Sequence, residues 1–287
     1  RAMRLRTHGK PRVIACGELL SDHLALPRGC LEEATALLSR SGVTPRLHDE
    51  RQPGQPLAAR FTGTLEPEQQ TAADALLAFE TGVLAATTAF GKTVVAAYLL
   101  AKRGVNTLVL VHRKHLQAQW VARLQSFLDV GPETIGVIGG GKRRPTGRID
   151  VALIQSLNQR GTVDDIVGTY GHVIVDECHH VSAVRFEAVA QAAKARYVLG
   201  LSATVTSKDG HHPIVFMQCG PVRHRVNART QAARRPFTHR VVTRRTGFVY
   251  PRTDDGRGEP GITDLYAAMG VDAERNALIV GDVRAAV

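Results

Sequence analysis

The chain has 287 residues, 44% of them hydrophobic, which is enough for one full core and a smaller second unit. The four cysteines form no C-x-x-C pair, which argues against a disulfide framework or a zinc ribbon and favours a reducing cytoplasm. No run of about 18 apolar residues occurs, so no membrane partner is expected. The formal net charge of +11 favours a polyanionic partner, although solvated basic surfaces are also common.

Residues 1–56 are predicted to form a small α+β domain. They mix short extended pieces, such as residues 12–15, with one helix over residues 29–40 that Gly42 ends. Residues 49–56 have the composition of a linker, with prolines and a glycine among polar residues. Because the sequence begins with Arg1 and not with Met, we expect a fragment of a longer protein.

A larger domain is predicted over residues 57–250. Short Val/Ile/Leu runs alternate there with helical patterns, which indicates an α/β fold with a doubly wound, mainly parallel sheet covered on both faces. Ligands bind at the carboxyl ends of the strands in such sheets, so functional residues should follow each run. The predicted strands are residues 83–86, 107–111, 134–138, 151–154, 173–175 and 197–201.

The last part, residues 251–287, is predicted to be a linker followed by two amphipathic helices split around Gly270. Just before it, residues 221–252 contain nine arginines and no acidic residue. This stretch would line a nucleic-acid channel or approach a further domain, and the sequence leaves both open.

The first motif that carries chemistry follows the strand at residues 83–86. A tight loop leads into Gly-Lys-Thr and then into an apolar helix over residues 94–101, an arrangement typical of a phosphate cradle. Lys92 would neutralise the β- and γ-phosphates, and the Thr93 hydroxyl would ligate Mg²⁺. The alternative is a helix start with a solvated lysine. The loop residues expected around the phosphates are Thr87, Thr88, Ala89, Phe90, Gly91, Lys92 and Thr93.

The second motif places Asp176 and Glu177 directly after the strand at residues 173–175. Adjacent carboxylates at this position can divide the work, Asp176 holding Mg²⁺ and Glu177 orienting or deprotonating the attacking water. A pair of surface acids is the alternative. A zinc site at Cys178, His179 and His180 is disfavoured, because residues adjacent on a loop rarely all face one ion.

A third motif, Leu-Gly-Leu-Ser-Ala-Thr at residues 199–204, completes a specific resemblance. The three motifs, in this order, resemble motifs I, II and III of superfamily 2 DExH-box helicases. Residues 107–120 are similar to motif Ia and residues 150–157 to the motif Ic region. The branch that contains type III restriction subunits and excision-repair helicases has segments similar to residues 26–31, 47–51 and 207–225. A closer resemblance is to bacterial helicases that accompany a primase-like domain in mobile conflict systems.

This resemblance implies a RecA-like P-loop NTPase motor domain that takes ATP and Mg²⁺. Gln69 would bind adenine through its amide. His179, Ser202, Ala203 and Thr204 would couple the nucleotide site to a second motor domain. Backbone phosphates of DNA, with RNA not excluded, would contact four residues from the motif Ia and Ic regions. These are Arg113, Lys114, Gln155 and Ser156.

Several residues keep two readings. Phe61 could stack near adenine and Trp120 on a base, but a core position is favoured for both, Trp120 being in helical register with other apolar residues. The glycine-rich basic turn at residues 139–147 would contact phosphate or form a solvated hairpin.

Three positions depart from the family pattern: Ala89 replaces a glycine, Glu66 an arginine and Leu153 a threonine. Ala89 would cost about 1 kcal/mol or more if its backbone were left-handed. None of the three removes a catalytic group.

The expected function is that of an ATP-dependent helicase or translocase of bacterial defence, repair or a mobile element. Motifs IV to VI are absent from the sequence, and with them the arginine finger of the second motor domain, typically worth about 10³ to 10⁵ in rate. We therefore expect weak ATP binding and very slow hydrolysis by this chain alone. The alternative is a non-catalytic nucleic-acid-binding module with a vestigial nucleotide site. A small-molecule P-loop kinase lacks support, because no lid segment is recognisable.

Overall fold

The computed structural model describes residues 16–159, 161–178, 183–203, 212–226, 242–250 and 261–286. The chain forms two compact units, residues 1–234 and residues 235–287.

The first unit is built on one large sheet. Its strand order is β12-β3-β11-β10-β4-β7-β5-β6, and every neighbouring pair is parallel except β5 and β6. The predicted α/β fold with a mainly parallel sheet is confirmed. The eight strands within the described residues are β3 (Thr81–Ala85), β4 (Thr107–Val111), β5 (Ile135–Gly139), β6 (Lys142–Arg144), β7 (Ile149–Leu153), β10 (His172–Val175), β11 (Tyr197–Ser202) and β12 (Val222–Arg225).

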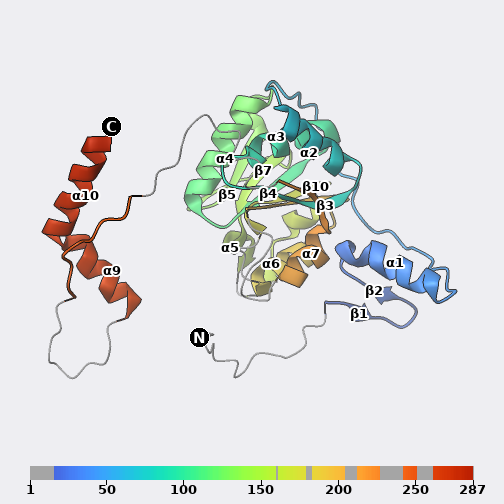
Figure 1. The fold of residues 1–287 in the computed structure, drawn as a ribbon. Coiled ribbons are helices and arrows are strands. Elements are labelled where there is room, and N and C mark those ends of the chain that lie inside the picture. Colours follow the sequence, from blue (N-terminus) through green and yellow to red (C-terminus); the bar gives the residue numbers. More distant parts are fainter. Residues whose placement is uncertain are drawn as a thin grey trace. The chain divides into compact units, whose positions relative to one another are not determined.

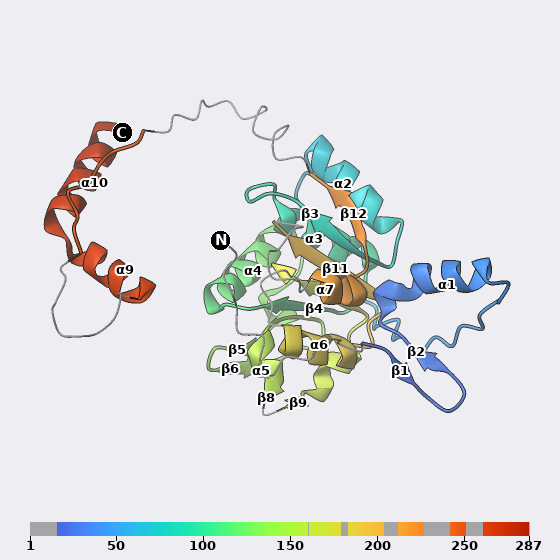
Figure 2. The same cartoon turned by 60° about the horizontal axis from the view of Figure 1, so that its bottom comes forward.

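Helices cover both faces of this sheet (Figures 1 and 2). One face carries α2 (Pro67–Leu77), α3 (Lys92–Arg103) and α4 (Lys114–Phe127), and the other carries α5 (Ile154–Leu157), α6 (Ala183–Ala192) and α7 (His212–Cys219). Successive strand residues enter different cores, because side chains alternate along a strand. Leu108 packs on the α7 side and Val109 on the α3 side. Two apolar cores explain why the strands read as unbroken Val/Ile/Leu runs.

Short elements connect these layers. The 3-10 helix η2 (Pro132–Thr134) precedes β5, and η3 (Asp165–Thr169) precedes β10. A small antiparallel pair, β8 (Asn158–Gln159) and β9 (Thr162–Val163), lies between β7 and η3. The sequence analysis did not predict α2 or β12. The antiparallel pair of β5 and the exposed β6 agrees with the solvated hairpin that was one of the two alternatives for residues 139–147.

Residues 16–56 contain a hairpin of two short strands, β1 (Glu18–Leu19) and β2 (Leu24–Ala25), each of two residues. The 3-10 helix η1 (Arg28–Cys30) and the helix α1 (Leu31–Arg40) follow. Gly42 follows α1 with a φ of 74°, which fits its predicted role as the end of the helix. The guanidinium of Arg28 donates to the main-chain carbonyls of Ala190, Ala193 and Ala195, at and beyond the carboxyl end of α6. A domain boundary at residue 56 stays a prediction.

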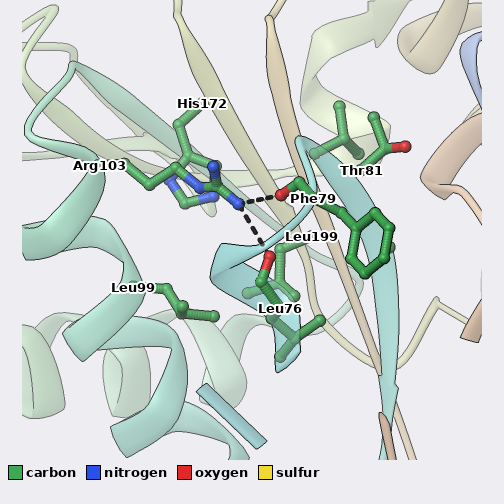
Figure 3. A pocket seen from close by; sticks show the side chains of 9 residues that line it. Leu76, Phe79, Thr81, Leu99, Arg103, His172 and Leu199 are labelled. Atoms are coloured by element: carbon green, nitrogen blue, oxygen red, sulfur yellow. Dashed lines mark hydrogen bonds between the residues drawn. The ribbon is translucent and has the colours of Figure 1, made fainter. Parts of the chain in front are cut away.

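Buried side chains pack together at the edge of the sheet where the amino ends of the parallel strands lie. His172 begins β10 and is 1% exposed, and the guanidinium of Arg103 donates to the carbonyls of Leu76 (3.2 Å) and Phe79 (2.5 Å). A small pocket lies among these side chains, with Leu99 and Leu199 on its walls (Figure 3). Burial lowers the pKa of His172 to about 3, and the Arg103 charge acts in the same direction. His172 is therefore neutral in the folded chain at physiological pH.

Asn106 holds four segments together at the same edge. Its side-chain oxygen accepts from the backbone N–H groups of Gln55 (2.9 Å) and Gly171 (3.0 Å), and its Nδ2 donates to the carbonyls of Gly147 (3.2 Å) and Thr169 (3.0 Å). Asn106 is 3% exposed. All the hydrogen-bonding groups of this buried amide are therefore satisfied.

The second unit contains α9 (Ile262–Val271) and α10 (Ala273–Ala286). Two helices were predicted, but the break falls at Asp272 and not at Gly270. Asp272 has an extended backbone, and its carboxylate accepts from the Arg275 backbone N–H at 2.6 Å, so it caps α10. In the same unit Arg244 donates to Asp282. Within the described ranges, no helix has the length and apolar character needed to span a bilayer.

Candidate nucleotide and nucleic-acid site

A left-handed loop connects β3 to α3. The loop covers residues 86–91, and its φ angles at Ala89 (68°) and Gly91 (87°) are both positive. The positive φ at Gly91 favours glycine, and a Cβ atom there would lie 2.5 Å from Nε2 of Gln69, which would have to move. Ala89 thus adopts the conformation that costs a non-glycine residue about 1 to 2 kcal/mol. A strained, glycine-dependent loop before a helix N-terminus is a geometry suited to anions.

Lys92 is the first residue of α3 and points back over this loop. Its Nζ donates to the carbonyl of Ala86 at 3.1 Å and lies 3.6 Å from Oε1 of Glu177. The Lys92 side chain is 10% exposed and that of Glu177 24% exposed. The structure therefore brings together the lysine and the carboxylates of the two motifs, which are far apart in sequence.

Asp176 and Glu177 follow β10 as predicted. Asp176 is 7% exposed, and its Oδ1 accepts from the backbone N–H of Glu177 at 3.0 Å. Glu177 has a φ of 46°, so both motifs place one non-glycine residue in the left-handed region. Strained residues of this kind concentrate at functional sites.

Burial raises the pKa of Asp176 above its ordinary value, and the charge of Glu177 adds to this. A hydrogen bond from Trp120 and the charge of Lys92 act in the opposite direction. A carboxylate desolvated in this way gains from a nearby cation. Carboxylate and hydroxyl oxygens are also the donors that Mg²⁺ prefers, so Asp176 and Thr93 fit the predicted metal by their chemistry.

Trp120 was predicted to belong to the core, and the structure confirms this, because Trp120 is 1% exposed. The sequence reasoning missed its polar contact: Nε1 donates to Oδ2 of Asp176 at 2.8 Å. From the sequence, only a general rule could have indicated this contact. A buried tryptophan usually finds an acceptor for its N–H.

Gln69 is buried beside the phosphate loop, at 9% exposure. Its Oε1 accepts from the backbone N–H of Glu66 (3.0 Å), and its Nε2 donates to the carbonyl of Phe90 (2.8 Å). Both groups of the amide are thus used within the chain. The departure at Glu66 falls on the N-cap of α2. Phe61 packs edge-on against Tyr98, with ring centroids 5.4 Å apart, so the favoured packing role is confirmed.

Ser202 ends β11, between β3 and β10, and is 3% exposed. Its carbonyl accepts from the Ala86 backbone N–H at 2.9 Å, which ties the third motif to the phosphate loop. Ala203 follows it. His179 and Thr204, the other predicted coupling residues, lie outside the described residues.

The four predicted nucleic-acid residues gather on the other half of the same edge. Arg113 and Lys114 follow β4 and are exposed, while Gln155 and Ser156 lie in α5 after the neighbouring strand β7. The glycine turn after β5 adjoins them. A Cβ atom on Gly139 would lie 2.5 Å from Oγ of Ser156, and one on Gly140 would lie 3.3 Å from Cε of Lys114.

The arginine-rich stretch is described only in part, because residues 227–241 and 251–252 lie outside the described residues. The guanidinium of Arg223 pairs with the carboxylate of Glu32 and lies 3.7 Å from the centroid of the Phe79 ring. Arg223 therefore links β12 to α1, a structural role that neither sequence interpretation included.

Comparison with known proteins agrees with this geometry. Residues 62–207 match the family model described as type III restriction enzyme, res subunit. The chain is 34% identical over 168 residues to a putative ATP-dependent RNA helicase of Acanthamoeba polyphaga mimivirus, which covers 57% of the chain and 32% of the relative. It is 32% identical over 161 residues to a DNA 3'-5' translocase of Sulfurisphaera tokodaii, covering 56% of the chain and 35% of the relative. The chain thus spans about a third of the length of both relatives.

A solved structure supports the fold. The UvsW helicase from Bacteriophage T4 superposes with a TM-score of 0.55 at 17% identity, over 71% of the chain and 80% of that structure. Together, the doubly wound sheet, the phosphate loop facing the two carboxylates and the matched family model show that the chain belongs to the superfamily 2 helicases, in the branch of the type III restriction res subunit.

Proposed function

We propose that the chain is the ATP-binding motor domain of an ATP-dependent helicase or translocase that acts on DNA. The single observation that carries the proposal is the placement of Lys92 Nζ 3.6 Å from Glu177 Oε1, beside a left-handed phosphate loop and next to Asp176. The bound Mg²⁺ would supply charge neutralisation at the phosphates. Thr93 and Asp176 would hold it.

In this proposal each residue has one task. Lys92 exchanges its contact with the Ala86 carbonyl for the phosphate oxygens, and the backbone N–H groups of residues 87–93 surround them. Glu177 orients the attacking water and accepts its proton. Gln69 uses one acceptor site of Oε1 and one N–H of Nε2 within the chain, so its second acceptor site and second N–H can contact adenine while both internal hydrogen bonds stay in place.

The carboxyl edge of β4 and β7 would guide the nucleic acid. Arg113 and Lys114 are exposed cations, and Gln155 and Ser156 offer neutral polar groups beside the glycine turn. Such groups bind backbone phosphates and do not read base edges. DNA is favoured by the name of the Sulfurisphaera tokodaii relative, whereas the mimivirus relative is named for RNA.

The test is a calorimetric titration with ADP, with and without Mg²⁺. The wild-type chain should bind more tightly with Mg²⁺, and Lys92→Ala should weaken this binding at least about tenfold through loss of a charged hydrogen bond. Lys102→Ala is the matched control, because Lys102 is an exposed lysine of the same helix. Equal wild-type affinity with and without Mg²⁺ would instead identify a vestigial site.

The nucleic-acid part needs its own assay. ATP hydrolysis by the full-length protein should rise with single-stranded or duplex DNA. Stimulation by RNA alone would overturn the DNA assignment and leave the nucleotide site intact.

A further inference from the structure

Trp120 reaches the candidate metal site from a helix that carries none of the motif I or motif II residues. It lies in the middle of α4 and is the one tryptophan of the chain. Its Nε1 donates to Oδ2 of Asp176 at 2.8 Å, and both partners are buried. We propose that Trp120 is a positioning residue whose indole N–H fixes the Asp176 carboxylate for magnesium binding. This inference rests on the proposed function.

The two oxygens of Asp176 are held by different donors. Oδ2 accepts from Trp120, and Oδ1 accepts from the backbone N–H of Glu177 at 3.0 Å. Together the two bonds fix the plane of the carboxylate. Because each oxygen of an ionised carboxylate has about two acceptor sites, a site remains on each for a cation. A carboxylate fixed in this way needs little reorganisation when the metal binds.

The donor itself is held rigidly. Trp120 packs in the core cluster that includes Leu124 of the same helix and Val109 and Val111 of β4. Asp176 follows β10, which pairs directly with β4, and the Asp176 backbone N–H donates to the Leu110 carbonyl at 2.9 Å. Donor and acceptor therefore stand on neighbouring elements of one core, so neither can turn away without repacking it.

The experiment removes the N–H and keeps the shape. Because the chain has one tryptophan, expression in a tryptophan auxotroph can replace Trp120 alone with benzothienylalanine, an isostere with sulfur in place of N–H. ADP affinity is then measured with Mg²⁺ and in EDTA. We expect the affinity with Mg²⁺ to fall about tenfold, as for loss of a hydrogen bond to a charged group, and the affinity in EDTA to stay as in wild type.

Leu124→Ala is the control for packing. Leu124 is fully buried in the same helix, and its side chain has no hydrogen-bond donor for Asp176. Its truncation should therefore lower the free energy of unfolding without changing the ratio of the two ADP affinities. Trp120→Phe provides a genetically encoded variant and should lower the same ratio as the isostere.

The outcomes separate the two hypotheses. If wild type shows no magnesium-dependent affinity, the proposed function fails. If wild type shows it and the isostere equals wild type, the function stands and the positioning role is overturned. If the isostere weakens binding equally with Mg²⁺ and in EDTA, Trp120 acts only through packing, which also overturns the inference.

Discussion

The carboxyl ends and the amino ends of the parallel strands lie at opposite edges of the large sheet, and these two edges are built in opposite ways. At the carboxyl edge lie Ala89 and Glu177, the two non-glycine residues with positive φ among the described residues, next to partly exposed charges. At the amino edge, His172 and Asn106 are buried, and Asn106 satisfies every hydrogen-bonding group of its amide. The strained backbone positions lie at the carboxyl edge, where the candidate ligands would bind, and the fully satisfied hydrogen-bond network lies at the amino edge.

This contrast predicts that substitutions at the two edges have different effects on stability and on ligand binding. Substitutions at the amino edge should change the free energy of unfolding and leave magnesium-dependent ADP affinity unchanged. Relief of strain at the carboxyl edge should increase stability.

Asn106→Ala should be the most damaging change. It removes four hydrogen bonds and leaves buried donors and acceptors without partners, for a loss of about 4 kcal/mol in the free energy of unfolding. Urea unfolding measures it. Asn158→Ala, at a partly exposed position in β8, is the control and should change stability by less than about 0.5 kcal/mol. A loss below about 1 kcal/mol for Asn106→Ala would show that water replaces these bonds.

His172 should make stability depend on pH. Its pKa is about 3 in the folded chain, against an ordinary value of about 6.5 in the unfolded chain, so the unfolded state binds the extra proton between these values. Its contribution is fully present above pH 6.5 and falls as the pH drops towards 3. At pH 5 the loss should be about 2 kcal/mol.

The measurement is the free energy of unfolding of wild type and His172→Gln between pH 7 and pH 5. The wild-type curve should fall more steeply by this amount, because other titrating groups contribute equally to both curves. Parallel curves would contradict the neutral, buried state of His172.

Ala89→Gly should have the smallest effect and the opposite sign. Glycine adopts a φ of 68° without the clash of a Cβ atom, so stability should rise by about 1 kcal/mol. Ala101→Gly within α3 is the matched control and should lower stability by up to about 1 kcal/mol, because glycine disfavours helix. If both substitutions destabilise the chain, the left-handed conformation at Ala89 is not a source of strain.

Much of the carboxyl edge could be predicted from sequence. The strands appear as short apolar runs, and the residues after them, from Lys92 to Asp176 and Ser202, follow from the rule that parallel strands present ligands at one edge. The contact between Lys92 and Glu177 agrees with this reasoning. Their motifs follow β3 and β10, two strands of one parallel sheet that are separated only by β11.

The amino edge and the supporting contacts could not be predicted in the same way. The bond from Trp120 to Asp176, the internal bonds of Gln69 and the contacts of Arg28 depend on side-chain directions across elements distant in sequence. The conformation of Ala89 was also undecided, since a loop of this composition permits both signs of φ.

The last strand of the sheet has a consequence for self-association. β6 contains only Lys142, Arg143 and Arg144, all exposed, and it forms the outer edge beside β5. An exposed edge strand can pair with the edge of another molecule and start aggregation. A very short edge of three basic residues, of which Arg143 pairs with Asp164, offers little backbone for pairing and places positive charge where a second copy would add its strand. The basic residues considered for phosphate contact thus also protect this edge against strand addition.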